Sequence, residues 1–160
     1  MNNAIQCHVL PFPRGVETVE PFAVARSGSF DDIATLARTY LEADAALVVV
    51  CPPREIWRAG ARRPVLATSI SAREGEEIAL IARDEMHRLA DPLIAQDHGF
   101  DFYLMVPLRS IDGVDFGSLT VLNRAARGAS DREISALRAL GRILVESIEL
   151  RSLLASARIS

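Results

Sequence analysis

The chain has 160 residues, a formal charge of −3 at pH 7 and 18 basic residues, all of them Arg. This length fits one domain with a substantial hydrophobic core, and a composition of 49% hydrophobic and 24% charged residues is typical of a globular protein. Neither half of the chain is basic enough for a nucleic-acid-binding surface. The absence of Lys excludes Schiff-base chemistry and a Walker-type phosphate lysine.

The hydropathy of the chain and the number and spacing of its Cys and His residues exclude further classes of protein. No apolar run approaches the roughly 18 residues of a membrane span, and the N-terminal sequence does not read as a signal peptide. Cys7 and Cys51 are too few for a disulfide framework or a four-cysteine zinc site, and no two His residues stand at i, i+4. We expect a cytoplasmic protein without a metal site that binds neither nucleic acid nor membrane.

The sequence pattern of the first half of the chain predicts a leader, one helix and several strands. Residues 1–28 are rich in Pro and Gly, which predicts an irregular leader. A helix over 29–43 follows, because Ser29 is a good N-cap and apolar residues then recur at helical spacing. The continuous apolar run Ala45–Cys51 predicts a strand covered on both faces. Weaker strands are expected over residues 55–59 and 64–70.

The second half first predicts a helix over 74–89, ended by Pro92. A hairpin follows, because two β-rich runs over 102–109 and 115–123 flank Asp112-Gly113, a type I′ turn dipeptide. Side-chain alternation gives this hairpin one apolar face. Its other face, called the mixed face below, carries Tyr103, Met105, Arg109, Phe116, Ser118, Thr120 and Leu122.

The last helix is predicted over 131–157 and begins with a capping box, Ser130-x-x-Glu133. It shows two apolar stripes, of which a single-domain sheet needs one. The first stripe is Ile134, Leu137, Gly141, Leu144 and Ile148. The second is Leu140, Ile143, Leu150 and Leu154, and it predicts a partner helix from an identical chain.

Together these elements predict an α+β domain over residues 29–160. Its central sheet is antiparallel, helices cover both faces, and the C-terminal helix is long.

Five segments resemble the GAF domain family, and most closely the bacterial signalling subgroup found upstream of diguanylate cyclases and histidine kinases. They are Asp91–Ala95, Phe102–Arg109, Asp112-Gly113, Phe116–Asn123 and Glu149–Arg151. GAF domains are similar to PAS domains: one face of an antiparallel sheet packs on dimerising terminal helices, and the other shelters a pocket. Members bind cyclic nucleotides, haem, bilins or small metabolites, and some bind nothing known.

The resemblance implies a non-enzymatic sensory or regulatory domain that dimerises through its terminal helices and controls a partner or effector domain. The resemblance does not indicate which cofactor, if any, the domain would bind. A small ligand would lie over the mixed face. The candidate ligand-binding residues are Trp57, His98, Tyr103, Met105, Ser118 and Thr120.

Several other functional hypotheses stay open. Asn123-Arg124 and Glu133 match in part the Asn-Lys and Asp pattern of cyclic-nucleotide-binding members. Cys7 and Cys51 would be needed for a thiol-dependent redox enzyme of the free methionine sulfoxide reductase type. The domain could also be a ligandless dimerisation module. The remaining candidates are a bilin attached at Cys7-His8, haem ligation by His87 or His98, and an anion site at Arg54, Arg58, Arg62 and Arg63.

Overall fold

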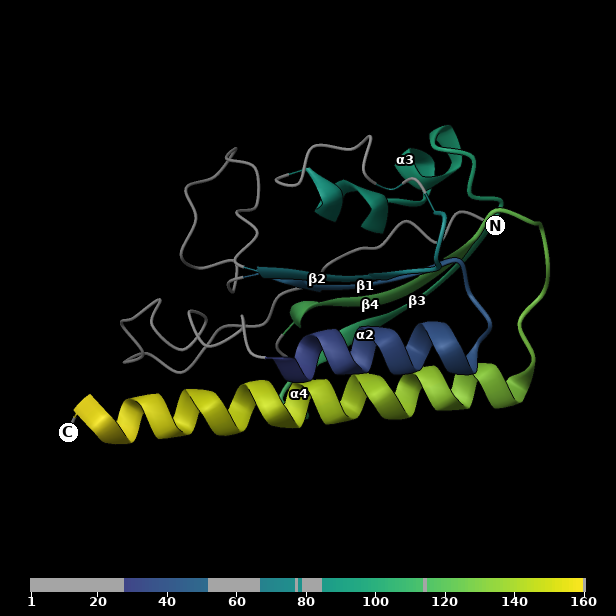
Figure 1. The fold of residues 1–160 in the computed structure, drawn as a ribbon. Helices are drawn as coiled ribbons and strands as arrows, with labels where there is room; N and C mark the ends of the chain where they lie inside the picture. The colour runs from purple at the N-terminus through teal and green to yellow at the C-terminus, as the bar shows by residue number, and fades with distance from the viewer. Residues whose placement is uncertain (1–27, 52–66, 77, 79–84, 114, 160) are drawn as a thin grey trace.

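The computed structural model describes residues 28–51, 67–76, 78, 85–113 and 115–159, and it is built on a four-stranded antiparallel sheet (Figure 1). The strands follow the order β2-β1-β4-β3. They are β1 (Ala45–Val50), β2 (Ala67–Ala72), β3 (Phe102–Arg109) and β4 (Asp115–Asn123). The helices are α2 (Gly28–Tyr40), the 3₁₀ helix η4 (Met86–Ala90), α3 (Pro92–Asp97) and α4 (Asp131–Ile159).

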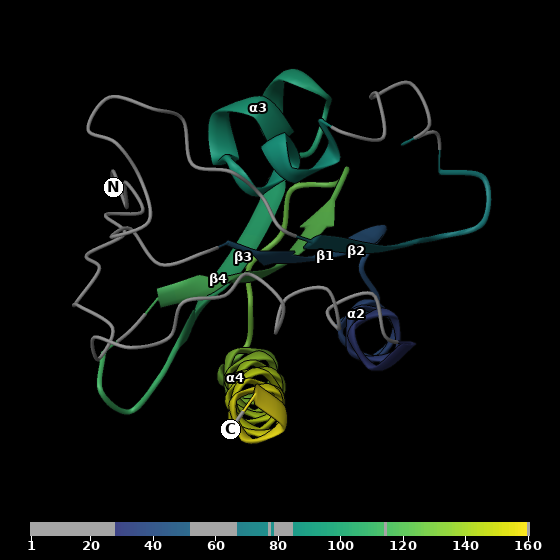
Figure 2. The ribbon, with the colours of Figure 1, turned by 90° about the vertical axis from the view of Figure 1, so that its left-hand side faces the viewer.

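Helices cover both faces of the sheet, as predicted. Figure 2 shows α2 and α4 side by side against one face and α3 against the other. The larger apolar cluster lies on the α2–α4 side and includes Val48, Leu119 and Leu137. The smaller one includes Leu47 and Leu89 and joins the sheet to η4 and α3. Every residue of β1 is buried, which confirms the strand covered on both faces.

The hairpin of β3 and β4 is confirmed at its predicted bounds, but a bulge changes one face. Arg109 pairs with Asp115 while the residue before it pairs with Gly117, so Phe116 is an extra residue on β4. Phe116 therefore packs into the α2–α4 cluster, and its predicted place on the mixed face is wrong. Gly117 has φ +145°, and a Cβ there would lie 1.8 Å from the Val49 carbonyl oxygen, which excludes a side chain.

The helix expected over residues 74–89 is wrong at both of its described ends. Gly75 lies in a turn at φ +84°, and the C-terminal end forms η4, while residues 79–84 lie outside the described part of the chain. Pro92 does not end a helix but opens α3, where the Asp91 side chain accepts from the Leu93 amide at 2.9 Å. Proline suits this position because its missing N–H has no helical acceptor there.

The terminal helix α4 begins as the capping box predicts. The Ser130 hydroxyl accepts from the Glu133 amide at 3.2 Å, and the Glu133 carboxylate accepts from the Ser130 amide at 2.8 Å. Its 29 residues extend for about 44 Å at 1.5 Å per residue, and its C-terminal part continues past the start of α2 in Figure 1. No helix in the described ranges is long and apolar enough to cross a membrane.

Candidate functional site

The mixed face of the sheet lies under η4 and α3, and four of the predicted ligand-binding residues meet there. Met105 of β3 lies opposite Thr120 of β4, and Ser118 lies two residues before Thr120 on the same face. Tyr103 packs against the η4–α3 cluster. The period-two alternation of the hairpin, which the bulge leaves intact at these positions, brings the four side chains together.

Thr120 is the unusual residue of this face. It is fully buried, and its Oγ1 atom has no hydrogen-bond partner among the described residues. Its cross-strand neighbours are Leu47 on one side and Met105 on the other, neither of which offers a strong acceptor. A buried hydroxyl without a partner costs about 1–3 kcal/mol, so Thr120 is the described residue of this face whose hydrogen-bonding capacity is unused.

Tyr103 fastens the 3₁₀ helix to the sheet. Its hydroxyl donates a hydrogen bond to the Ala90 carbonyl oxygen. Burial raises the pKa of Tyr103 to about 12, so the phenol stays protonated and remains a donor. The neighbouring Thr120 hydroxyl opposes part of this rise, although its Oγ1 does not reach hydrogen-bonding geometry.

The two other predicted ligand residues are not brought to this face by the described structure. His98 follows α3 as its C-cap and is exposed; its backbone oxygen accepts from Arg124 at 2.7 Å. Trp57 lies outside the described residues. So do Cys7, His8, Arg54, Arg58, Arg62 and Arg63.

The described structure gives no added support to a reactive cysteine, a haem-binding histidine or a metal site. Cys51 directly follows β1 and is 7% exposed, and burial among apolar groups favours an unreactive thiol. His87 lies in η4 and is half-buried. Within the described ranges, no three His, Cys, Asp or Glu side chains are placed to hold a metal ion.

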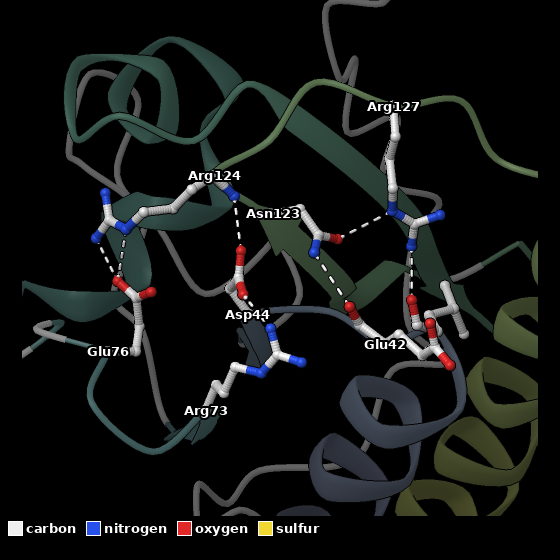
Figure 3. Close-up of polar contacts among 8 residues, drawn as sticks. Glu42, Asp44, Arg73, Glu76, Asn123, Arg124 and Arg127 are labelled. Carbon is white, nitrogen blue, oxygen red and sulfur yellow. Dashed lines mark hydrogen bonds and ion pairs between the residues drawn. The ribbon is translucent and has the colours of Figure 1, made fainter.

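A polar network joins the ends of the strands at one edge of the domain (Figure 3). The Arg124 guanidinium binds Glu76 at 2.8 Å and stacks on the Phe100 ring at 4.4 Å. Arg127 instead binds Glu133, at 2.8 Å. The pairing of Arg124 with Glu133 that a cyclic-nucleotide pattern would imply is therefore absent, because each arginine has a different carboxylate.

The α2–α4 side presents exposed apolar residues. Three of the four residues predicted for a dimer are open to solvent: Ile143, Leu150 and Leu154 are 52%, 58% and 55% exposed. Leu140 is different, because it packs partly buried against the α2–α4 cluster. The prediction missed Leu153, which is 68% exposed.

Two arginines of α4 fix the position of α2. Arg151 donates to the Ser29 hydroxyl at 2.7 Å near the start of α2, and Arg132 donates to the Tyr40 hydroxyl at 2.8 Å at its end. The two helices therefore run antiparallel. The polar position Arg151, which interrupts the second apolar stripe, has a partner within the chain.

The family model for the GAF domain matches residues 26–148, and no curated protein sequence matches the chain. Among solved structures, the chain is similar to the photoproduct state of GAF3 from Slr1393 of Synechocystis sp. PCC6803, with a TM-score of 0.57 and 15% identity over 81% of this chain and 96% of that one.

Two further structures show the same fold. The blue-light absorbing form of the PixJ GAF domain of Thermosynechococcus elongatus gives a TM-score of 0.53 and 19% identity, over 86% of this chain and 92% of that one. A domain of a protein described as a two-component sensor histidine kinase of Sinorhizobium meliloti 1021 gives 0.55 and 14%, over 82% and 96%. At these identities the likeness concerns the fold alone.

Proposed function

The chain belongs to the GAF domain family, and from this premise we propose that it is a sensory domain that binds a small molecule on the mixed face. The bound state is passed on through α2 and α4 of a homodimer to a partner protein or an effector domain. Membership of the subgroup found upstream of diguanylate cyclases and histidine kinases is part of the same proposal.

The observation that carries the proposal is the buried hydroxyl of Thr120, which has no hydrogen-bond partner in the part of the chain that the structure describes. Natural proteins satisfy nearly all buried polar groups, and replacement of Thr by Val would remove this cost with almost no change of shape. The hydroxyl lies on the face where the apolar residues Leu47 and Met105 flank it. Such a setting suits a largely apolar ligand with one hydrogen-bonding group.

The exposed residues of α4 support the homodimer. Ile143, Leu150 and Leu154 are spaced by seven and four residues, so at 3.6 residues per turn they lie on one narrow stripe. Burying a leucine is worth about 1.5–3 kcal/mol, and in a symmetric pair each copy contributes its own stripe. The similar structures include a blue-light absorbing GAF domain and a domain of a two-component sensor histidine kinase, and a regulatory role is consistent with both.

Native mass spectrometry of the purified chain tests both parts. The wild-type protein should appear as a dimer, and after incubation with a small-molecule filtrate of a cell extract it should carry an added mass. The double variant Leu150→Arg and Leu154→Arg should be monomeric and still carry that mass. The control Leu93→Arg, at a residue of α3 that is 70% exposed on the opposite side of the sheet, should remain dimeric. A monomeric wild-type protein would remove the dimer from the proposal.

A redox enzyme remains the alternative in a different class. It requires an accessible thiol, and Cys51 is buried. Substituting Cys7 and Cys51 by Ser separates the two functions: a thiol-dependent methionine sulfoxide reductase activity that these substitutions abolish would favour the enzyme. A protein that dimerises but carries no added mass would be a ligandless dimerisation module.

A further inference from the structure

Arg124 holds together the segments around the mixed face. Its guanidinium binds Glu76, which follows β2, and donates to the His98 carbonyl oxygen at the end of α3 at 2.7 Å. Its backbone amide donates to the Asp44 carboxylate at 2.9 Å, just before β1. The Glu76 side chain is 9% exposed, so this ion pair is better shielded from water than an ordinary surface pair.

Arg127, three residues later, makes a matching set of contacts on the side of the signalling helices. It donates to the Leu41 carbonyl oxygen, after the end of α2, at 2.7 Å. It also binds Glu133, in the first turn of α4, at 2.8 Å, and it stacks on the Phe102 ring at 4.2 Å. Arg127 therefore connects the end of α2 to the beginning of α4.

Asn123, the last residue of β4, joins the two arginines. It precedes Arg124 in the chain, and its side-chain oxygen accepts from Arg127 at 3.2 Å. Its side-chain nitrogen donates to the Glu42 carbonyl oxygen at 3.2 Å. Glu42 is the one described non-glycine residue with a positive φ, 50°, a conformation that non-glycine residues seldom adopt without support. Figure 3 shows Arg124, Asn123 and Arg127 in a row above the Glu42–Asp44 turn.

We propose that Arg124, Asn123 and Arg127 form a polar relay that couples the segments around the mixed face to the start of α4. This inference rests on the proposed function, because it supplies the route by which a ligand would act on the output helices. A molecule that moves the α3–β3 turn must move Arg124, and the shared strand end and the Asn123 amide pass that movement to Arg127. The helix start then shifts because Arg127 holds Glu133.

Amide hydrogen exchange of the full chain, followed residue by residue by NMR, tests the relay without any ligand. Arg124→Ala removes the contacts on the mixed-face side only. A coupled network transmits free energies that correspond to about 5-fold or larger effects. We therefore expect the Ile134 amide, which donates to Ser130 at 3.0 Å in the first turn of α4, to exchange at least about 5-fold faster in the variant. The Ala43 amide, which donates to the Arg38 oxygen at 2.9 Å, should behave likewise.

The reverse experiment uses the other end of the relay. Arg127→Ala should speed the exchange of the Gly99 and Phe100 amides of the α3–β3 turn, although no hydrogen bond or ring contact joins Arg127 to either of these described residues. The matched control is Arg88→Ala, which removes an exposed arginine of η4 whose ion pair with Glu85, at 3.6 Å, lies outside the relay. It should leave the Ala43 and Ile134 amides unchanged.

The result that would overturn the relay is an effect of Arg124→Ala that stops at residues 73–76 and 98–100. If Arg124→Ala does not fold, Glu76→Gln, which removes one charge and keeps the shape, must show the same pattern with a smaller amplitude, and a local pattern in that variant overturns the relay as well. Because no ligand and no dimer is needed, these outcomes do not depend on the mass-spectrometric test of the proposed function.

Discussion

Replacing Thr120 by Val should make the unliganded domain more stable, although it removes a polar group from the proposed ligand site. The hydroxyl is fully buried and its Oγ1 has no partner among the described residues. Valine has nearly the same shape and is equally β-branched, so it fits the strand without a new cavity. The substitution therefore removes a desolvation cost and breaks no hydrogen bond of good geometry among the described residues.

The expected gain can be estimated from that cost. A buried unsatisfied hydroxyl costs about 1–3 kcal/mol, so Thr120→Val should raise the free energy of unfolding by about 1–2 kcal/mol. For a chain of this size, 1 kcal/mol shifts the Tm by about 2–4 °C, which gives a rise of about 2–8 °C. Urea unfolding of the ligand-free protein measures the free energy, and thermal unfolding followed by circular dichroism measures the Tm.

Two threonines serve as controls. Thr68 lies on β2 and is half-buried, so Thr68→Val should change the free energy of unfolding by less than about 0.5 kcal/mol. Thr35 donates to the Ser71 hydroxyl at 3.2 Å, so Thr35→Val should destabilise by up to about 1 kcal/mol. If Thr120→Val destabilised the domain by 1 kcal/mol or more, the hydroxyl would have a partner in the free protein and the reasoning would be refuted.

Three further outcomes follow from the structure. Gly117→Ala should lower the free energy of unfolding by about 3 kcal/mol or more, because φ is +145° and the new Cβ would lie 1.8 Å from a β1 carbonyl oxygen; Gly128→Ala, with open space at its Cβ, should change it by less than about 0.5 kcal/mol in the same urea titration. Since burial raises the pKa of Tyr103 to about 12, tyrosinate absorbance should show a step near pH 12 that Tyr103→Phe removes. The contribution of the neutral phenol to the free energy of unfolding should be fully present below pH about 10 and lost as the pH rises toward 12. A hydrogen bond from the Ser130 backbone, together with Arg127, lowers the pKa of Glu133 below 4.5. The contribution of the Glu133 carboxylate to the free energy of unfolding is therefore present above that value and is lost as the pH falls through the lower folded pKa. Glu133→Gln should reduce the loss of stability at acid pH, and an unchanged pH dependence would count against the capping interaction.

The hairpin and α4 could be predicted because their signals are local. Asp112-Gly113 marks the position of the turn, and the alternation of the flanking strands then places Tyr103 and Thr120 on one face. The predicted type I′ turn is wrong, because Gly113 has a positive φ of 82° and Asp112 does not. The Ser130 capping box sets the start of α4. The bulge at Gly117 could not be foreseen, because it depends on the close approach of β1, a strand distant in sequence.

The helix over residues 74–89 failed for a different reason. Its apolar spacing resembled a helical stripe, but Gly75 adopts a left-handed conformation that interrupts a helix. The apolar residues Ile78 and Leu89 are buried as expected, yet each has a 3₁₀ and not an α-helical conformation. For these two described residues, periodicity therefore identified the burial and not the conformation that buries them.

The polar relay was the least predictable part of the site. Arg124 and Glu76 are 48 positions apart, and Arg124 and Asp44 are 80 apart, so no local pattern pairs them. Arg127 carried one usable signal, because it stands six positions before Glu133 and follows the strand end. The lack of a hydrogen-bond partner for Thr120 among the described residues was equally unpredictable, because it depends on which side chains the fold places around the hydroxyl.

The most direct test of the account compares the ligand retained by two proteins. Wild type and Thr120→Val are incubated with the same small-molecule filtrate of a cell extract and weighed by native and then by denaturing mass spectrometry. The account predicts an added mass on the native wild-type protein that disappears on denaturation, and a loss of most of that mass from Thr120→Val although this variant is the more stable of the two. An added mass of equal occupancy on both proteins, or none on the wild type, would contradict a ligand site at Thr120.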